Sequence, residues 1–296
     1  ERRRAGLNLA MGLVGKLRQT VVQYAQMSVV LDGLEPMEVR SPYPLACTWM
    51  DMDAATTGAE LRGPFVSFVE ALVAYVGTIA ATLLDGSGKT LPPSISSGKP
   101  ASGNWLEVIR AGLTSEVMQG EDREWLLPLV EEPNFIRYKN KAGAECQGKL
   151  LRLMDKLVTL RNPLVHGRTL PGQVYLGAIT PYLSEVQEVM SALDFLEDWC
   201  PYVVLAIKGS SPKGFCHQVR RLKGTSITSR ALEAHLQKAV DPQSVLLLSS
   251  DLSFHLDLSN WIRFDVCATC ERETLFIFNG WDRRRDPKYK PMDCRH

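Results

Sequence analysis

The stretch PFVSFVEALVAYVGTIAATLL, residues 64–84, carries a single charged residue, Glu70. Its large apolar side chains recur at steps of three and four residues, which is the spacing of one helix face. That face consists of Phe65, Phe68, Leu72, Val76, Ile79 and Leu83. A second face is made of small residues, which let a neighbouring helix approach closely. The uncharged run 71–84 is shorter than the roughly 20 residues that cross a bilayer. We therefore predict a buried helix within a bundle, and no membrane span.

Helical patterns lie on both sides of this stretch. They cover residues 7–31, 102–116, 122–130, 142–160 and 180–199. After Trp199 the sequence pattern changes to short runs of β-branched and aromatic residues bounded by turn residues. These runs predict strands. These runs are residues 202–207, 245–248, 254–258 and 274–278, with one helix expected at 229–240. The predicted fold class is α+β, with a helical domain in residues 1–200 and a small β-rich domain in residues 201–296.

Composition narrows the class of protein. The 296 residues have a formal net charge of +1, which excludes the broad basic field of a constitutive nucleic-acid coat protein. The seven cysteines are odd in number and scattered, unlike a secreted disulfide framework. With no secretory signal segment at its start, the chain is expected to be cytoplasmic. It begins at Glu1 rather than Met, so we expect a fragment or processed product that lacks an N-terminal domain.

The segment Leu160-Arg-Asn-Pro-Leu-Val-His-Gly167 is the first functional signal. Pro163 disfavours helical geometry at the residue before it and can begin a new helical turn itself. The pattern therefore predicts a helix boundary between Arg161 and His166. A break there can turn both side chains to one side, whereas a continuous helix separates positions five residues apart by about 140°.

Arg-Asn, three residues and His at a helix junction in a bundle resembles the signature of HEPN domains. The resemblance covers about residues 60–200 and implies a helical domain that forms homodimers. It further implies metal-independent cleavage of RNA, frequently in antiviral defence or toxin systems. In that family's pattern the matching positions are Arg161, Asn162 and His166, and two copies would meet at the dimer interface.

The chemistry of these residue types suits RNA cleavage. RNA carries its own nucleophile, the 2′-hydroxyl, so the expected product is a 2′,3′-cyclic phosphate. The imidazole of His166 titrates near neutral pH and can transfer a proton. The guanidinium of Arg161 can stabilise charge that develops on the phosphate, and the amide of Asn162 can orient either partner. The sequence thus predicts a metal-independent endoribonuclease with RNA as its substrate.

A second hypothesis belongs to a different class of function. His166 precedes Gly167, and a histidine at a helix C-terminus is stabilised there without any catalytic role. Arg161 can pair with Glu185 or Asp155. The chain would then be a non-catalytic dimerisation module that binds a partner protein or nucleic acid within a larger protein. Arg161 and His166 exposed in a cleft would favour the enzyme, and intrachain bonds to both would favour the module.

Four metal-ligand residues lie near the end of the chain, in Cys267-Ala-Thr-Cys270 and Cys294-Arg-His296. The first pair has the spacing of a zinc knuckle, and four such ligands resemble a zinc ribbon, a closed structural site. The alternatives are reduced thiols without an ion, and a redox Cys-x-x-Cys pair.

The segment between the two pairs gives a reason for them to meet. Asn279-Gly280 is a strong hairpin-turn signal, and a hairpin there would bring the second pair back toward the first. We expect a structural zinc ion that folds residues 265–296 only, because the two domains are expected to have separate cores.

A third signal is the basic and aromatic segment WDRRRDPKYK, residues 281–290. Arginine and lysine contact phosphates and aromatic rings stack on bases, so the segment is a candidate nucleic-acid contact. A further basic cluster, Arg220, Arg221 and Lys223, belongs to the same part of the chain. The alternative is a solvated, charged strand edge that discourages pairing with other chains.

Overall fold

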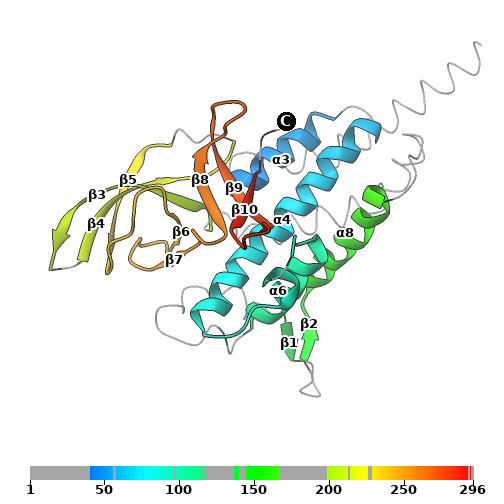
Figure 1. Ribbon diagram of the computed structural model, residues 1–296, viewed down its shortest axis with the longest axis horizontal. Helices are drawn as coiled ribbons and strands as arrows, with labels where there is room; N and C mark the ends of the chain where they lie inside the picture. Colours follow the sequence, from blue (N-terminus) through cyan, green and yellow to red (C-terminus); the bar gives the residue numbers. More distant parts are fainter. Residues whose placement is uncertain are drawn as a thin grey trace, which may run out of the picture.

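The computed structural model describes residues 41–55, 58–96, 98–114, 117, 137–139, 145–166, 199–212, 214–225, 229–292 and 294. Helices, together with two short strands at 137–139 and 145–147, make up the first part of this range and antiparallel sheets the second, so the α+β class is confirmed. Figure 1 shows the five-stranded sheet at one side, the helices at the other and the three-stranded sheet between them. The helices expected at 7–31, 122–130 and 180–199 lie outside the described residues. That the helices form a HEPN bundle stays a prediction.

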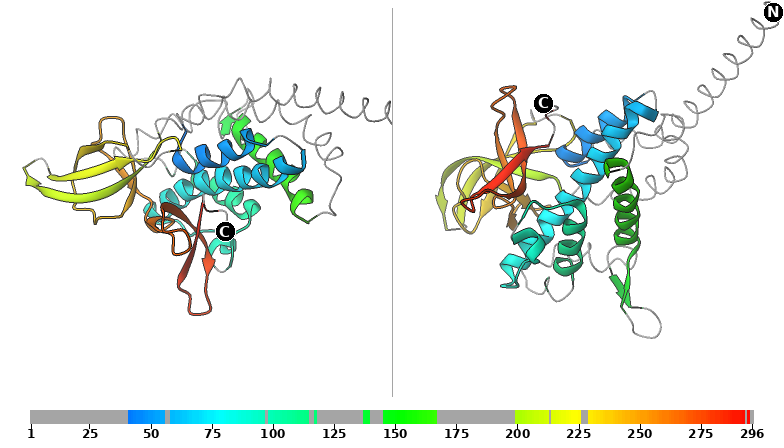
Figure 2. Two further views of the ribbon diagram at one scale, coloured as in Figure 1. Left: turned by 90° about the horizontal axis from the view of Figure 1, so that it is seen from above. Right: turned by 45° about the vertical axis from the view of Figure 1, so that its right-hand side comes forward.

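The central helix is α4 (Gly58–Gly86), which contains the apolar stretch of residues 64–84. It packs against α3 (Tyr43–Asp53), α6 (Ser102–Gly112) and α8 (Lys149–His166), while the short α5 (Pro93–Ser96) contacts α6. Figure 2 shows these helices from two further sides. α4 is long and apolar enough to cross a membrane, but 78% of its apolar window is buried inside the protein. It is therefore the core helix that the sequence predicts.

α4 does make a close helix contact, with α6, but at Gly77 and Ala80 rather than on the small-residue face predicted from the sequence. A Cβ atom at Gly112 of α6 would lie 2.4 Å from the carbonyl oxygen of Ala80, far inside contact distance. A Cβ atom at Gly77 would lie 2.6 Å from Cε3 of Trp105. The lack of a side chain at both glycines lets α6 lie directly on α4 and lets the Trp105 ring cover Gly77.

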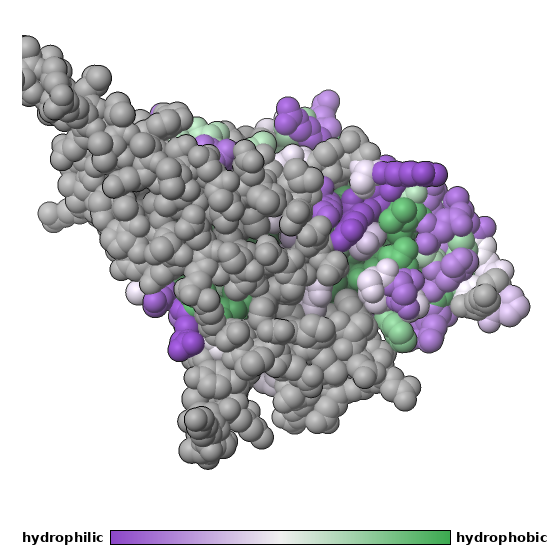
Figure 3. All heavy atoms as spheres, turned by 180° about the vertical axis from the view of Figure 1, so that it is seen from behind, coloured by the Kyte–Doolittle hydropathy of each residue, from purple (hydrophilic) through white to green (hydrophobic). Residues whose placement is uncertain are grey.

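The strands form three antiparallel sheets. The five-stranded sheet has the order β5-β4-β3-β6-β7, the three-stranded sheet the order β10-β9-β8, and β1 pairs with β2. Their bounds are β1 Arg137–Lys139, β2 Glu145–Gln147, β3 Pro201–Ser211, β4 Gly214–Arg221, β5 Ala231–Leu236, β6 Val245–Leu248, β7 His255–Asp257, β8 Ile262–Val266, β9 Glu273–Trp281 and β10 Pro287–Pro291. The four strands predicted from the sequence are confirmed. On the described part of the back face, hydrophilic residues surround a hydrophobic area (Figure 3).

Two predicted helices are wrong in whole or in part. Residues 231–236, expected to be helical, form β5 and pair with β4, with Ala234 and Leu236 fully buried. Alternate residues of this segment fit a half-buried sheet face, and pairing with β4 overrides its helix propensity. The helix expected at 142–160 starts only at Lys149, after β2, and continues to His166.

The hairpin turn also differs from its prediction. Asn279 and Gly280 lie within β9, and the chain reverses at residues 282–286 instead. Gly280 has a φ of 104°, and a Cβ atom there would lie 2.8 Å from the carbonyl oxygen of Gly98. The glycine is needed because β9 passes directly over the loop around Gly98, rather than because the strand turns.

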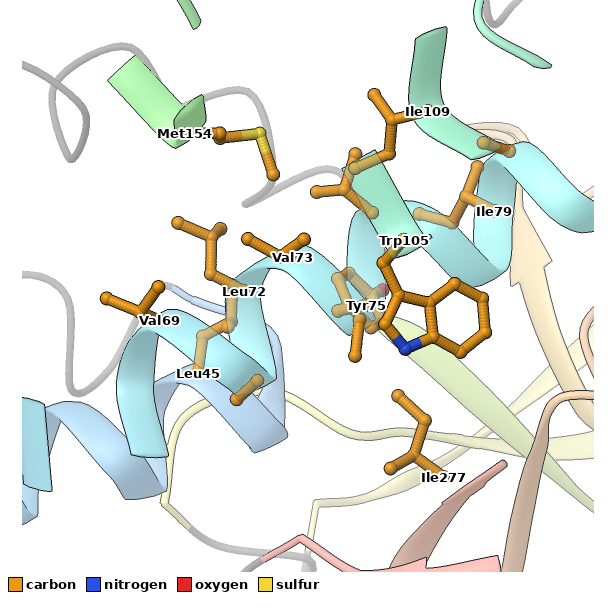
Figure 4. Close-up of a cluster of buried hydrophobic side chains, with 14 of the residues drawn as sticks. Leu45, Val69, Leu72, Val73, Tyr75, Ile79, Trp105, Ile109, Met154 and Ile277 are labelled. Atoms are coloured by element: carbon orange, nitrogen blue, oxygen red, sulfur yellow. The ribbon is translucent and has the colours of Figure 1, made fainter. Parts of the chain in front are cut away.

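The hydrophobic core does not divide at residue 200. One cluster of buried side chains runs from the helices into both larger sheets, and it includes Trp105 of α6 together with Ile277 and Phe278 of β9. Figure 4 shows Ile277 close to Trp105 and to the side chains of α4. A smaller cluster fills the other face of the five-stranded sheet. For the described residues the expectation of separate cores is wrong, although the boundary at residue 200 itself stays a prediction.

Candidate functional sites

Arg161 and Asn162 lie on a helix that does not break where the sequence predicts a boundary. α8 continues through Pro163 to His166, so the predicted change of direction is wrong. On this continuous helix, positions 161 and 166 are separated by about 140° around the axis. The side chain of His166 lies outside the described part of the chain, and its catalytic assignment stays a prediction.

The guanidinium of Arg161 is held by contacts within the chain. Its Nη2 donates a hydrogen bond to Oε1 of Glu70 on α4, and its Nη1 donates to Oδ1 of Asn162 at 3.3 Å. The side chain of Arg161 is only 11% exposed. Of the two carboxylates expected from the sequence, Asp155 pairs with Arg110 instead, and Glu185 lies outside the described residues. The Nε of Arg161 is buried without a hydrogen-bond partner.

Glu70 connects three elements through one carboxylate. Besides Arg161 of α8, it accepts a hydrogen bond from Nζ of Lys290 on β10 at 3.4 Å. Burial alone would raise the pKa of Glu70, but the hydrogen bond from Arg161 and the charges of Lys290 and Arg161 outweigh it. The pKa of Glu70 therefore lies below its ordinary value. Sequence reasoning missed this residue as a site, although it is the one charge in the apolar stretch.

We expect the Glu70 contacts to make the protein sensitive to acid. The folded pKa is lowered, so the unfolded state binds the proton more readily. The stabilisation is complete above the unfolded pKa of about 4.3 and is lost as the pH falls through the folded value. Glu70→Gln should cost about 1–3 kcal/mol at neutral pH, because two cations lose their carboxylate. Urea unfolding of both proteins between pH 3 and 7 measures the difference.

A matched control for Glu70→Gln is Glu233→Gln. Glu233 pairs with Lys208 at 3.1 Å, but both side chains are exposed, so the substitution should cost less than about 1 kcal/mol. Equal losses in the two variants, or an unchanged acid dependence in Glu70→Gln, would contradict the role assigned to Glu70.

Three thiols meet at one end of the three-stranded sheet. The Sγ atoms of Cys267, Cys270 and Cys294 all lie within 4.8 Å of one another, and those of Cys270 and Cys294 are 3.5 Å apart. In a tetrahedral zinc site with Zn–S bonds of about 2.3 Å, neighbouring sulfur atoms are about 3.8 Å apart, so the cluster fits a metal ion. These three residues can hold a metal ion, as predicted. His296 lies outside the described residues.

The thiols meet because the backbone brings their segments together. Cys267 and Cys270 occupy the tight connection from β8 to β9, where the N–H of Cys267 donates to the carbonyl of Arg272 at 2.8 Å. β10 then returns antiparallel to β9, which delivers Cys294 to the same end of the sheet. The second cysteine segment does come back to the first, but through the turn at 282–286.

A cavity of about 560 Å³ adjoins this cluster. It lies between the facing sides of α3 and the first turns of α4, and Met292 and Cys294 form one of its walls. The other described lining residues are Cys47, Thr48, Asp51, Ala54, Ala55, Glu60, Gly63, Pro64 and Ser67. Cys294, one of the three thiols of the candidate metal centre, therefore also lines this cavity.

The turn between β9 and β10 presents three consecutive arginines. Asp282 fixes its backbone by accepting hydrogen bonds from the N–H groups of Arg284 at 2.7 Å and Asp286 at 2.9 Å. Arg283, Arg284 and Arg285 are exposed, and none of their guanidinium groups has a partner among the described residues. Beside the turn, Trp281 donates from Nε1 to the carbonyl oxygen of Ile95 at 2.9 Å. Its ring is therefore held against the protein.

The second basic cluster of the sequence is engaged elsewhere. Arg220 pairs with Glu273 at 3.4 Å, and the guanidinium of Arg221 lies over the ring of Tyr202. These contacts lie on the five-stranded sheet and its border with β9. Of the two basic clusters found in the sequence, the one in the β9–β10 turn therefore has adjacent arginines without partners among the described residues.

No protein-family model, no curated protein and no solved structure matches this chain. The resemblance to HEPN domains stays a prediction that rests on residues 160–167 and their helical setting.

Proposed function

We propose that this chain is a non-catalytic module that binds nucleic acid through the turn between β9 and β10. The observation that carries the proposal is the run Arg283–Arg285, three exposed guanidinium groups without partners among the described residues, on a backbone fixed by Asp282. Arginine offers planar donor pairs that match phosphate oxygens. Because the turn is already ordered, little conformational entropy is lost when a phosphate backbone binds it.

The setting of Arg161 supports a module rather than an enzyme. A guanidinium that stabilises a phosphate must reach it, and this one is mostly buried and paired with Glu70. Its contacts join α4 to α8, which is a structural role. Homodimerisation through the helical domain and binding of a partner protein are also part of the proposal.

The thiol cluster gives the module its rigidity. We propose a structural zinc ion held by Cys267, Cys270 and Cys294, with His296 as the fourth ligand. Such an ion would tie the β8–β9 connection to the segment after β10, and so hold the sheet that carries the arginine turn. We also propose a reducing, cytoplasmic setting, since the six cysteines whose side chains the structure describes are all thiols.

Binding of a fluorescein-labelled 20-nucleotide RNA and of the matching DNA tests the proposal. Replacement of Arg283, Arg284 and Arg285 by Ala should weaken binding at least about tenfold at physiological salt. It should also reduce the slope of log K against log salt concentration by about 1 for each phosphate that the variant no longer neutralises. Fluorescence anisotropy across a salt series measures both quantities.

The matched control removes the same charge elsewhere. Lys208, Arg230 and Lys238 lie around the five-stranded sheet and are exposed. Their replacement by Ala changes the net charge equally and should leave affinity within about twofold. An equal loss in both triple variants would mean that net charge alone governs binding, and no binding by the unmodified chain would refute the proposal.

The second candidate is the metal-independent endoribonuclease of HEPN type, with Arg161, Asn162 and His166 as its centre. The observation in its favour is that Asn162 is exposed and accepts a hydrogen bond from Arg161 at 3.3 Å, which places two of the three motif residues together at the surface of α8. If this candidate is right, the chain cuts RNA in chelator to 2′,3′-cyclic ends, and His166→Ala abolishes the cut. Binding without cleavage favours the module.

A further inference from the structure

We propose that Cys270 and Cys294 are a site of oxidative modification, at which a hydroperoxide converts the two thiols into an intrachain disulfide. The disulfide excludes a metal ion from the cluster. The disulfide part of this inference rests on the thiols alone, and only the release of zinc rests on the zinc ion proposed above.

The geometry favours this pair of sulfur atoms. Their separation of 3.5 Å has to shrink to the bond length of about 2.05 Å, which small rotations about the Cα–Cβ bonds can supply. Cys270 precedes β9 and Cys294 follows β10, so the two residues flank the open end of the hairpin formed by β9 and β10. The paired strands hold both sulfur atoms in place before any oxidation.

Exposure distinguishes these two thiols from the third. Cys267 is 4% exposed, whereas Cys270 and Cys294 are partly exposed. Cys294 also lines the cavity between α3 and α4, which gives a small oxidant a route to its sulfur. Since thiol oxidation follows access, the reaction should begin at Cys294 or Cys270 and spare Cys267.

The reaction is balanced with hydrogen peroxide as oxidant. The thiolate of Cys294 attacks one peroxide oxygen, the O–O bond breaks, and a sulfenic acid forms as one water molecule leaves. The thiolate of Cys270 then attacks that sulfur and displaces the hydroxyl group, which leaves as a second water molecule after taking up a proton. Two thiols and one hydrogen peroxide thus give one disulfide and two water molecules. The same sequence with the two cysteines exchanged gives the same product.

Formation of the disulfide removes two of the three sulfur ligands at once. A thiolate is the form that binds a metal, and a sulfur atom in a disulfide is not. Cys267 and the proposed fourth ligand, His296, are too few to retain the ion, so oxidation releases it. In an oxidising environment, the three-stranded sheet that carries the arginine turn would therefore lose its metal ion.

Peptide mapping of the whole chain after treatment with one equivalent of hydrogen peroxide tests the inference. We expect the Cys270–Cys294 cross-link to be the main oxidised product, reversed by a phosphine reductant. In zinc-loaded protein, a chromogenic chelator should detect about one zinc ion released per cross-link formed. A Cys267–Cys270 link, sulfinic acid without a link, or unreacted thiols would overturn the proposal.

Variants separate the pair from other thiols. Cys294→Ser and Cys270→Ser should abolish the cross-link, while Cys216→Ser, which alters a partly exposed thiol on β4, should leave it unchanged. The mapping of unmodified protein decides the question even if a variant does not fold. If the reduced protein holds no zinc, the metal proposal fails, yet the cross-link still decides the thiol pair.

Discussion

When a strong chelator removes zinc from the reduced protein, we expect the backbone amides of β8, β9 and β10 to lose most of their protection against hydrogen exchange. Structural zinc contributes about 10–16 kcal/mol of apparent binding free energy in small domains, and a site absent from the unfolded chain turns that energy into folding energy. The loss should spread to the segment around Ile95 and Gly98, because Trp281 and Gly280 contact it directly. Mass-spectrometric hydrogen exchange before and after chelation measures the extent.

The zinc content of purified variants identifies the ligands. Cys270→Ser should lower the zinc content of purified protein from about one ion to near zero, and Cys216→Ser should not change it. His296→Ala should weaken zinc binding while the three thiolates still meet. Zinc-free protein after reducing purification, or loosening confined to residues 265–296, would contradict these expectations.

Trp105→Ala should lower the free energy of unfolding by about 3–5 kcal/mol, the usual cost of deleting a buried tryptophan. The ring is 4% exposed and makes edge contacts with Trp261 at 6.1 Å and Phe278 at 6.5 Å between ring centroids. It also covers Gly77 of α4. Its removal leaves a cavity at the meeting point of α4, α6 and β9.

The form of unfolding tests whether the core is shared. Urea unfolding followed by far-ultraviolet circular dichroism and by tryptophan fluorescence should show coincident transitions, both displaced in Trp105→Ala. The control is Trp281→Ala, whose side chain is 36% exposed and which should cost roughly 1 kcal/mol. Two separate transitions, of which Trp105→Ala shifts only one, would show that the helices and the three-stranded sheet fold independently.

The wrong predictions share a physical cause. Residues 231–236 carry helix-forming side chains, yet hydrogen bonds and side-chain burial against β4 decide their conformation. Pro163 suggested a helix boundary, but packing of α8 on α4 keeps the helix continuous. Asn279-Gly280 suggested a turn, but the glycine lies within β9, where the lack of a side chain lets the strand pass close to Gly98. In each case a distant segment outweighed a local preference.

The sequence by itself determined the features that depend on local pattern. Period and length of residues 64–84 identified the core helix, β-branched runs identified four strands, and the cysteine spacing identified the thiols that can hold a metal ion. These predictions were correct because residues close together in the sequence are enough to specify a helix face, a strand or a zinc knuckle.

Only the tertiary structure decided how the elements meet. It joined Glu70 to Arg161 and Lys290, residues 91 and 220 positions away along the chain. It merged the cores of helices and sheets around Trp105, and set the Cys270 and Cys294 sulfur atoms 3.5 Å apart. Such contacts depend on packing between segments far apart in sequence, and no local pattern encodes which surfaces will be in contact.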